Sequence, residues 1–257
     1  MTSLSFEPER PAARLAEAAR TGNRLIDLPE PERPRTMDDA YVIQDLFVGL
    51  LDDPIIGWKI AGASPAGLRG ELPNPAVIGC VTRSRVYESG ATIPLPPGAV
   101  PTLETEVALR AVRELTPEME ALNVAEMFDK AFVAIEVVCS RFVDRKAVSY
   151  PSFVGDNAGF HAFVVGDELP MSADARFDED AGLWAGDERF AASLSGDKRT
   201  QPFVSLGFLW REFARRAVII PKGAIITTGT LSVPVDTARP GYLEARLGSA
   251  KVGLRFA

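Results

Sequence analysis

The sequence predicts an α+β protein, in which a helical N-terminal segment precedes a large, mainly β domain. Two observations indicate this division. Up to about residue 54, apolar residues recur at helical spacing among alanine, arginine and glutamate. From Ile55 onward, short β-branched runs alternate with glycine, proline, asparagine and aspartate, which is typical of antiparallel or mixed sheets. We therefore expect two units, a helical segment over residues 1–54 and a β-rich domain over residues 55–257.

Two helices are expected in the N-terminal segment. The first covers residues 9–24 and turns Leu15 and several alanines to one face. The proline-rich stretch 28–35 cannot be helical. The second helix covers residues 36–52, where Thr36 can cap the N-terminus and Asp38 and Asp39 favour the first turn. Later helices are expected over residues 116–129 and 202–216.

The β domain is expected to contain at least eight strands. Their apolar runs are separated by turn residues, and residues 184–187 have the character of a hairpin inside the irregular, acidic stretch 166–200. The expected strands cover residues 55–60, 76–81, 91–95, 104–111, 132–138, 160–165, 224–228 and 251–256.

The composition excludes several classes of function. The formal net charge is −7 over 257 residues and no basic cluster is present, which disfavours nucleic acid or an anionic membrane as the partner. No apolar run is long enough to cross a membrane, and residues 1–20 have no signal core, so we expect a cytoplasmic protein. Cys80 and Cys139 are expected to be reduced and buried, and His161 to be a packed structural histidine. One histidine and two scattered cysteines disfavour zinc.

Three glutamates are the candidate metal ligands. Glu104 and Glu106 alternate along one expected strand and therefore share one face of the sheet. Glu136 interrupts a run that is otherwise apolar on both faces, and a buried carboxylate requires a cation, donors or a raised pKa. Three such carboxylates can bind a hard divalent ion such as Mg²⁺ or Mn²⁺. Glu104 and Glu106 alone would favour a solvated sheet face, and Glu136 is the residue that changes this balance.

Two further motifs suggest ligand contacts. Lys59 lies among apolar residues and glycines, where it could hold a substrate anion or titrate with a lowered pKa, or could extend from a strand end to water. Thr228 and Gly229 could offer a hydroxyl and a backbone N–H to a carboxylate, or could simply end a strand.

Taken in order, these segments resemble the 2-keto-4-pentenoate hydratase and oxalocrotonate decarboxylase branch of the fumarylacetoacetate hydrolase superfamily. The likeness runs from the first helix to the C-terminus, and the ordered set of motifs carries it. The matching motifs are Gly57-Trp58-Lys59-Ile60, Pro101-Thr102-Leu103-Glu104-Thr105-Glu106, Ala134-Ile135-Glu136 through Arg141, Asp156-Asn157-Ala158, Gly223 through Gly229, and Leu247 through Val252.

The resemblance implies a mixed-sheet β roll preceded by a helical segment, and a homo-oligomer. It also implies a Mg²⁺ or Mn²⁺ ion and a small anionic 2-oxo acid as substrate. By the same likeness, the metal ligands are Glu104, Glu106 and Glu136. Lys59, Asp156 and Ser84 are then the candidate catalytic residues, and Lys59, Arg141, Thr228 and Gly229 the candidate substrate-binding residues.

The implied activity is that of a lyase in aromatic-compound catabolism, hydrating a 2-hydroxy-2,4-dienoate to a 4-hydroxy-2-oxo acid. Family hydratases carry an acidic residue where an ungapped placement puts Ser84, so decarboxylation of a 2-oxo-3-enedioate is the alternative. Acylpyruvate-type C–C hydrolysis is a further alternative, which the lack of a candidate lid His/Glu pair disfavours. A non-catalytic partner subunit or metabolite-binding module is the competing hypothesis from another class.

Overall fold

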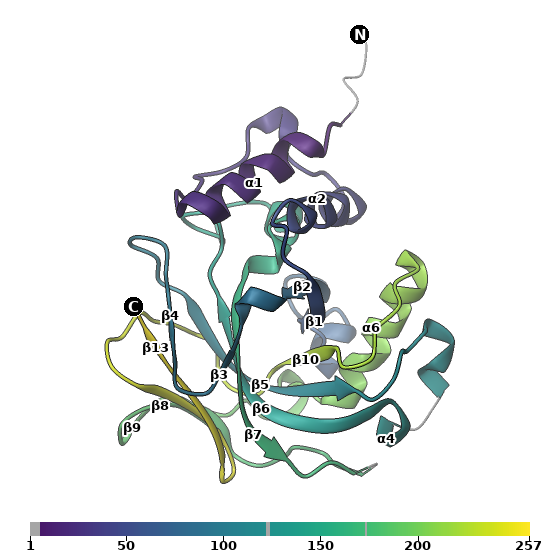
Figure 1. Cartoon of the computed structure of the whole chain (residues 1–257), viewed down its shortest axis with the longest axis vertical. Coiled ribbons are helices and arrows are strands. Elements are labelled where there is room, and N and C mark those ends of the chain that lie inside the picture. The colour runs from purple at the N-terminus through teal and green to yellow at the C-terminus, as the bar shows by residue number, and fades with distance from the viewer. Residues whose placement is uncertain (1–5, 122–123, 173) are drawn as a thin grey trace.

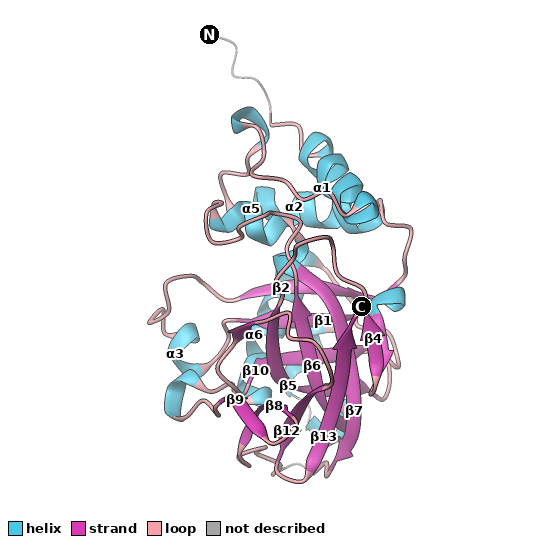
Figure 2. Cartoon of the chain, turned by 90° about the vertical axis from the view of Figure 1, so that its left-hand side faces the viewer, coloured by secondary structure: helices cyan, strands magenta, loops and turns pink. Residues whose placement is uncertain are grey.

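The computed structural model describes residues 6–121, 124–172 and 174–257. It divides into a helical end and a β end, as Figures 1 and 2 show. The longer helices are α1 (Glu9–Thr21), α2 (Met37–Gly49) and α6 (Pro202–Arg216). Shorter helices are α3 (Pro65–Leu68), α4 (Val124–Met127) and α5 (Tyr150–Gly155), with 3-10 turns at Glu30–Glu32, Arg83–Arg85, Pro117–Ala121, Asn157–Gly159 and Gly196–Lys198.

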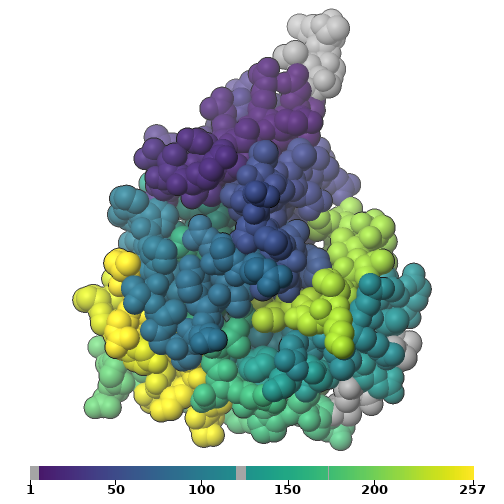
Figure 3. Space-filling model, in the orientation of Figure 1, coloured from purple at the N-terminus to yellow at the C-terminus, as the bar shows by residue number. Residues whose placement is uncertain are grey.

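The N-terminal helices are confirmed, with capping as the sequence predicts. The Thr36 side chain accepts the Asp39 N–H, and the Asp39 carboxylate accepts the Thr36 N–H, which forms a reciprocal capping box. α1 ends at Gly22, whose positive φ of 74° suits a residue without a Cβ. In the space-filling view, these helices cover one end of the molecule (Figure 3).

The strands form two sheets that pack against each other. The larger sheet has the order β2-β1-β10-β5-β6-β7-β3, with β11 added on β5, and the smaller sheet has the order β4-β13-β12-β8-β9. The strands are β1 (Ile55–Ala61), β2 (Val77–Thr82), β3 (Val86–Glu88), β4 (Ala91–Ile93), β5 (Thr102–Ala111), β6 (Phe128–Val138), β7 (Phe160–Leu169), β8 (Ala181–Ala185), β9 (Glu188–Ala191), β10 (Ile225–Thr230), β11 (Val235–Asp236), β12 (Leu243–Leu247) and β13 (Ala250–Phe256).

Both parallel and antiparallel pairs occur, so the predicted mixed-sheet α+β fold is confirmed. β1 pairs with β10, β3 with β7, and β4 with β13 in parallel, whereas β5, β6 and β7 form an antiparallel core. All eight predicted strands are present, and β8 and β9 form the predicted hairpin. The sequence analysis missed β3, β11 and β12, which are short or interrupted by charged residues.

One predicted helix, over residues 116–129, is partly wrong. The structure has a 3-10 turn at Pro117–Ala121 and the single turn α4, and Phe128 and Asp129 already belong to β6. Residues 122 and 123 lie outside the described residues. The apolar Phe128 pairs with Ala111 of β5, so tertiary pairing overrides the local helical pattern.

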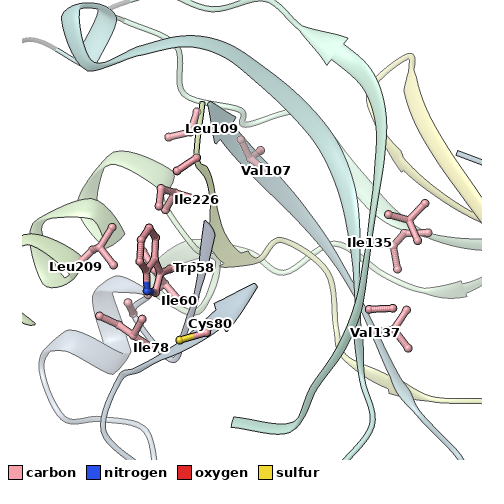
Figure 4. Close-up of a cluster of buried hydrophobic side chains, with 14 of the residues drawn as sticks. Trp58, Ile60, Ile78, Cys80, Val107, Leu109, Ile135, Val137, Leu209 and Ile226 are labelled. Carbon is pink, nitrogen blue, oxygen red and sulfur yellow. The ribbon is translucent and has the colours of Figure 1, made fainter. Parts of the chain in front are cut away.

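The larger sheet has one apolar face, which forms the main core. Alternating residues of neighbouring strands point to it, as Figure 4 shows for Trp58 and Ile60, Val107 and Leu109, and Ile135 and Val137. Leu209 of α6 packs against the same cluster. Because side chains alternate along a strand, Lys59, Glu104, Glu106 and Glu136 point to the opposite face.

The close pairing of β1 with β10 depends on Gly57. A Cβ at this position would lie 2.0 Å from the Ile225 carbonyl oxygen, a backbone atom that cannot move without breaking the sheet. We expect Gly57→Ala to lower the free energy of unfolding by more than about 3 kcal/mol, measured by urea denaturation. Gly49 in α2 has nothing within 4 Å of its virtual Cβ and is the control. There alanine should stabilise the protein by about 0.5–1 kcal/mol.

Candidate metal and active site

The three predicted metal ligands converge on one face of the larger sheet. Glu104 of β5 lies directly opposite Glu136 of β6 in the antiparallel register, and Glu106 lies two residues further along β5. Each glutamate offers a carboxylate oxygen, and these oxygens lie within 4.8 Å of one another. Glu106 and Glu136 are buried, whereas Glu104 keeps some exposure. We call these residues the glutamate trio.

The Glu106 carboxylate is held at one of its two oxygens. Its Oε2 accepts hydrogen bonds from the Thr227 hydroxyl and, at 3.0 Å, from the Gly229 N–H. An irregularity in the pairing of β10 with β5, between Thr227 and Thr230, places both donors on this carboxylate. Its Oε1 is buried and has no partner among the described residues. The carboxylate is therefore fixed, with one oxygen left for a ligand.

The trio is electrostatically unfavourable without a cation. Burial, and then the charge of Glu136, raises the pKa of Glu104 to about 7. Burial and the charges of Glu136 and Glu104 raise the pKa of Glu106 well above its usual value, although bonds from Thr227 and Gly229 oppose the shift. A divalent cation would remove this penalty by favouring the ionised carboxylates.

Lys59 adds one positive charge beside the trio. Its Nζ is buried, donates to the Ala158 carbonyl at 2.8 Å, and lies 3.0 Å from Glu136 Oε1. The pair with Glu136 is at ion-pair distance but is not aligned as a hydrogen bond. Gly79 of the neighbouring strand makes room for the lysine, because a Cβ there would lie 2.9 Å from Lys59 Cε. The sequence left open whether Lys59 extends into water, and the structure places its ammonium group inside the protein.

The donor set suits a hard divalent ion. All three candidate ligands are carboxylates, which Mg²⁺ and Mn²⁺ prefer. One lysine does not balance three carboxylates, and Glu106 Oε1 and Glu136 Oε1 make no hydrogen bond in the described part of the chain. These orphaned oxygens are the structural observation that fits a bound cation.

Arg141 and Asp156 form a buried ion pair with each other. The Arg141 guanidinium donates to the Asp156 carboxylate and to the Phe160 carbonyl, and Ser140 Oγ donates to Asp156 Oδ2 at 2.6 Å. This network fixes the turn that carries Ala158, the acceptor for Lys59. The structure therefore places both residues behind Lys59, where they can support it, and their predicted roles toward substrate stay predictions.

Neutralising Asp156 is expected to destabilise the fold. Asp156→Asn would leave the Arg141 guanidinium buried without its counter-charge, at a cost of about 3–5 kcal/mol. Chemical denaturation of the variant measures this cost. Asp129→Asn, which breaks the exposed pair with Arg110, is the control and should cost at most about 1 kcal/mol. Equal effects of the two substitutions would contradict the expectation.

The remaining candidate residues are Ser84, Thr228 and Gly229. Ser84 is exposed and donates to Asp53 Oδ2 at 2.6 Å. Ser84 follows Thr82, the last residue of β2. Thr82 is roughly 10 Å along the strand from Gly79, the residue of β2 that lies beside Lys59, so the structure does not bring Ser84 to the trio. Thr228 donates to the Val107 carbonyl at 3.0 Å, and the Gly229 N–H is engaged by Glu106.

Two residues near the trio were missed by the sequence analysis. Thr227 orients Glu106. The Thr-Thr-Gly-Thr motif at the end of β10 could have indicated Thr227, but only Thr228 and Gly229 of that motif were selected as candidates. The charge of Arg145 opposes the rise in the pKa of Glu104 that burial and Glu136 cause. No sequence pattern connected Arg145 with β5. His161 is buried, with Nε2 2.8 Å from the Pro94 carbonyl, as expected for a structural histidine.

A large cavity lies away from the trio. Its volume is about 880 Å³, and Asp45, Trp58, Cys80 and Arg216 are among the residues that line it. Trp58 and Cys80 belong to the apolar face of the sheet. This cavity is therefore separate from the face that carries Lys59 and the glutamates.

Comparison with known proteins finds relatives that match the chain over most of its length. No family model matches the chain. A 2-keto-4-pentenoate hydratase from Burkholderia vietnamiensis is 28% identical over 243 residues and covers 92% of both chains. The hydratase of the same name from Paraburkholderia phymatum is 28% identical over 246 residues, 93% of each chain.

The fold has solved counterparts. The 4-oxalocrotonate decarboxylase from Pseudomonas putida G7, complexed with magnesium and adipate, matches 99% of this chain and 100% of its own, with a TM-score of 0.79 and 20% identity. The fumarylpyruvate hydrolase from Pseudomonas aeruginosa, complexed with Mn²⁺ and pyruvate, matches 80% of this chain and 91% of its own, with a TM-score of 0.53 and 14% identity.

The fold is thus the α+β fold of fumarylacetoacetate hydrolase family proteins. Within that class, the predicted resemblance to the 2-keto-4-pentenoate hydratase and oxalocrotonate decarboxylase branch is confirmed by relatives that match the chain over nearly its whole length. Among the described residues, the helices are all too short or too polar to span a membrane.

Proposed function

We propose that the protein is a divalent-metal-dependent lyase that hydrates a 2-hydroxy-2,4-dienoate to a 4-hydroxy-2-oxo acid in aromatic-compound catabolism. The convergence of Glu104, Glu106 and Glu136 beside the buried Lys59 carries this proposal. The curated relatives named 2-keto-4-pentenoate hydratase support the reaction type.

The glutamate trio would hold a Mg²⁺ or Mn²⁺ ion. Glu106 is oriented for this task by Thr227 and Gly229, and Glu136 by its proximity to Lys59. When bound, the ion would supply a Lewis acid for the carboxylate and 2-oxygen of the substrate. The magnesium and Mn²⁺ complexes among the structural neighbours support this choice of metal.

Lys59 is the residue that we propose to act on the reacting atoms. Its ammonium group is fixed between the Ala158 carbonyl and Glu136, inside the protein, where its charge is poorly screened. It can neutralise negative charge that develops on a dienolate, or hold the proton that moves to and from the carbon chain. Its burial also excludes water from this side of the site.

Decarboxylation of a 2-oxo-3-enedioate is the second candidate. The oxalocrotonate decarboxylase fold covers the chain almost completely, which favours it. Loss of CO₂ also makes less demand on a dedicated general base, and the exposed Ser84 offers none near the trio. C–C hydrolysis and a non-catalytic role have no comparable observation in their favour.

Parallel assays distinguish these reactions. The protein is loaded with Mg²⁺ or Mn²⁺ and supplied with 2-hydroxypenta-2,4-dienoate or with 2-oxohex-3-enedioate. A hydratase forms a 4-hydroxy-2-oxo acid from the first compound, and a decarboxylase releases CO₂ from the second. Turnover of neither compound by protein that binds the metal would contradict the proposed substrate class.

We further propose that the protein is a homo-oligomer, as the resemblance implies, and that it is cytoplasmic, as expected from the sequence. Light scattering coupled to size-exclusion chromatography measures its molar mass in solution. A mass equal to the 27.7 kDa of one chain would contradict this proposal.

A further inference from the structure

Arg145 is a cation beside the trio that the proposed mechanism does not use. Its Nη2 donates to Thr102 Oγ1 at 2.9 Å. Thr102 shares a face of β5 with Glu104 and lies two residues before it, a distance of roughly 7 Å along the strand.

The guanidinium retains hydrogen-bond donors for a ligand. It has five N–H donors, and the bond to Thr102 is the only one it makes within the described residues. Asp236 Oδ1 is 3.9 Å from Arg145, which is too far for a hydrogen bond. Asp236 instead accepts from Thr102 and, at 2.9 Å, from Lys146 Nζ. The nearby Asp144 accepts the backbone N–H of Lys146.

The position of the guanidinium is restricted, and there is space beside it. Its Cζ lies 5.7 Å from the centre of the Phe153 ring, a cation–π contact. Phe153 in turn packs beside Tyr150, with 6.1 Å between the ring centres. Arg145 also borders a cavity of about 170 Å³, which Val138 and Lys146 line as well. The Arg145 side chain is 29% exposed, so a ligand can reach it.

We infer that Arg145 is a specificity-determining residue that binds a second carboxylate at the far end of the substrate, so that the site prefers a dicarboxylate to the monocarboxylate of equal chain length. This inference rests on the proposed function, because the first carboxylate is the one held at the trio. Guanidinium groups bind carboxylates through two parallel hydrogen bonds. Because Arg145 is bonded to Thr102, which lies roughly 7 Å along β5 from Glu104, a substrate with carboxylates about that far apart has the length needed to contact both the trio and Arg145.

Two probes of equal chain length test the inference. In the presence of Mg²⁺, the affinities of 2-oxoadipate and 2-oxohexanoate are measured by calorimetry, since the two acids differ only in the second carboxylate. We expect the wild-type protein to bind 2-oxoadipate roughly ten to a hundred times more tightly. Arg145→Gln should remove most of this preference by weakening 2-oxoadipate alone, and Arg145→Lys should retain part of it.

Lys146→Gln is the matched control. It removes the same charge from the neighbouring residue, whose side chain is 69% exposed and points its Nζ at Asp236. This variant should keep the wild-type preference. Equal affinity of the wild-type protein for both acids would by itself overturn the inference. A preference for 2-oxoadipate that is retained in Arg145→Gln would also overturn it. Binding of oxalate with Mg²⁺ is measured alongside, because its absence would overturn the proposed function itself.

Discussion

Replacing Glu106 with glutamine is expected to abolish the stabilisation of the protein by Mg²⁺ or Mn²⁺. An ion at a hundredfold excess over its Kd contributes about 2.7 kcal/mol, or roughly 5–10 °C in Tm for a chain of this size. Glu106 Oε1 is one of the orphaned oxygens of the trio, and the amide nitrogen of glutamine cannot replace it as a ligand. Differential scanning fluorimetry with oxalate and either metal measures the loss.

The same substitution should leave the metal-free protein at least as stable as the wild type. Burial and the neighbouring carboxylates raise the pKa of Glu106, so its ionised form is unfavourable without a cation. The amide oxygen of glutamine can still accept from Thr227 and Gly229. A Tm that falls strongly without metal would show misfolding instead of ligand loss.

Glu168→Gln serves as the control for Glu106→Gln. Glu168 lies in β7 of the same sheet, is half exposed, and pairs with Lys130. The control removes the same charge without affecting the trio. If Glu106→Gln and Glu168→Gln respond equally to metal, the trio is not the metal site. The turnover of Glu106→Gln should fall by at least about a hundredfold, since even outer-shell partners of a ligand have effects of ten- to a hundredfold.

Lys59→Met is expected to reduce turnover by roughly 10²–10⁴-fold, the range for loss of a positioned acid–base group. The variant should also be less stable than the wild type without metal, by about 3–5 kcal/mol, because Glu136 loses its buried counter-charge. Mg²⁺ should then stabilise Lys59→Met more than it stabilises the wild type. Steady-state kinetics and metal-dependent thermal unfolding measure the two effects separately.

Lys130→Met is the matched comparison for Lys59→Met. Lys130 is also a strand lysine paired with a glutamate, but its side chain is partly exposed and that of Glu168 is half exposed. Removing it should change stability by at most about 1 kcal/mol and leave the kinetics unchanged. Normal turnover by Lys59→Met would contradict its proposed role, even if the stability effect were found.

The repeating patterns of the chain were sufficient for most of the fold. Thr36 and Asp39 predicted the start of α2, and the alternation around Glu104 and Glu106 predicted β5 with the correct face. The helix over residues 116–129 failed because its last residues pair with β5, which is a long-range contact. The short strand β12 also depends on its neighbours, since it gains its order from pairing with β8 and β13.

Local sequence patterns are sufficient to select the side chains that can bind a metal, whereas long-range packing controls how those side chains are arranged and used. Alternation along a strand is a local property, so it placed Glu104 and Glu106 on one face, and the apolar run around Glu136 marked a buried carboxylate. The register that sets Glu136 opposite Glu104, and the position of Lys59 beside them, depend on strands distant in sequence. The same is true of Arg141 facing Asp156, of Ser84 lying outside the site, and of Arg145 reaching Thr102. Contacts of this kind arise from strand pairing and packing, which the local pattern of residues does not encode.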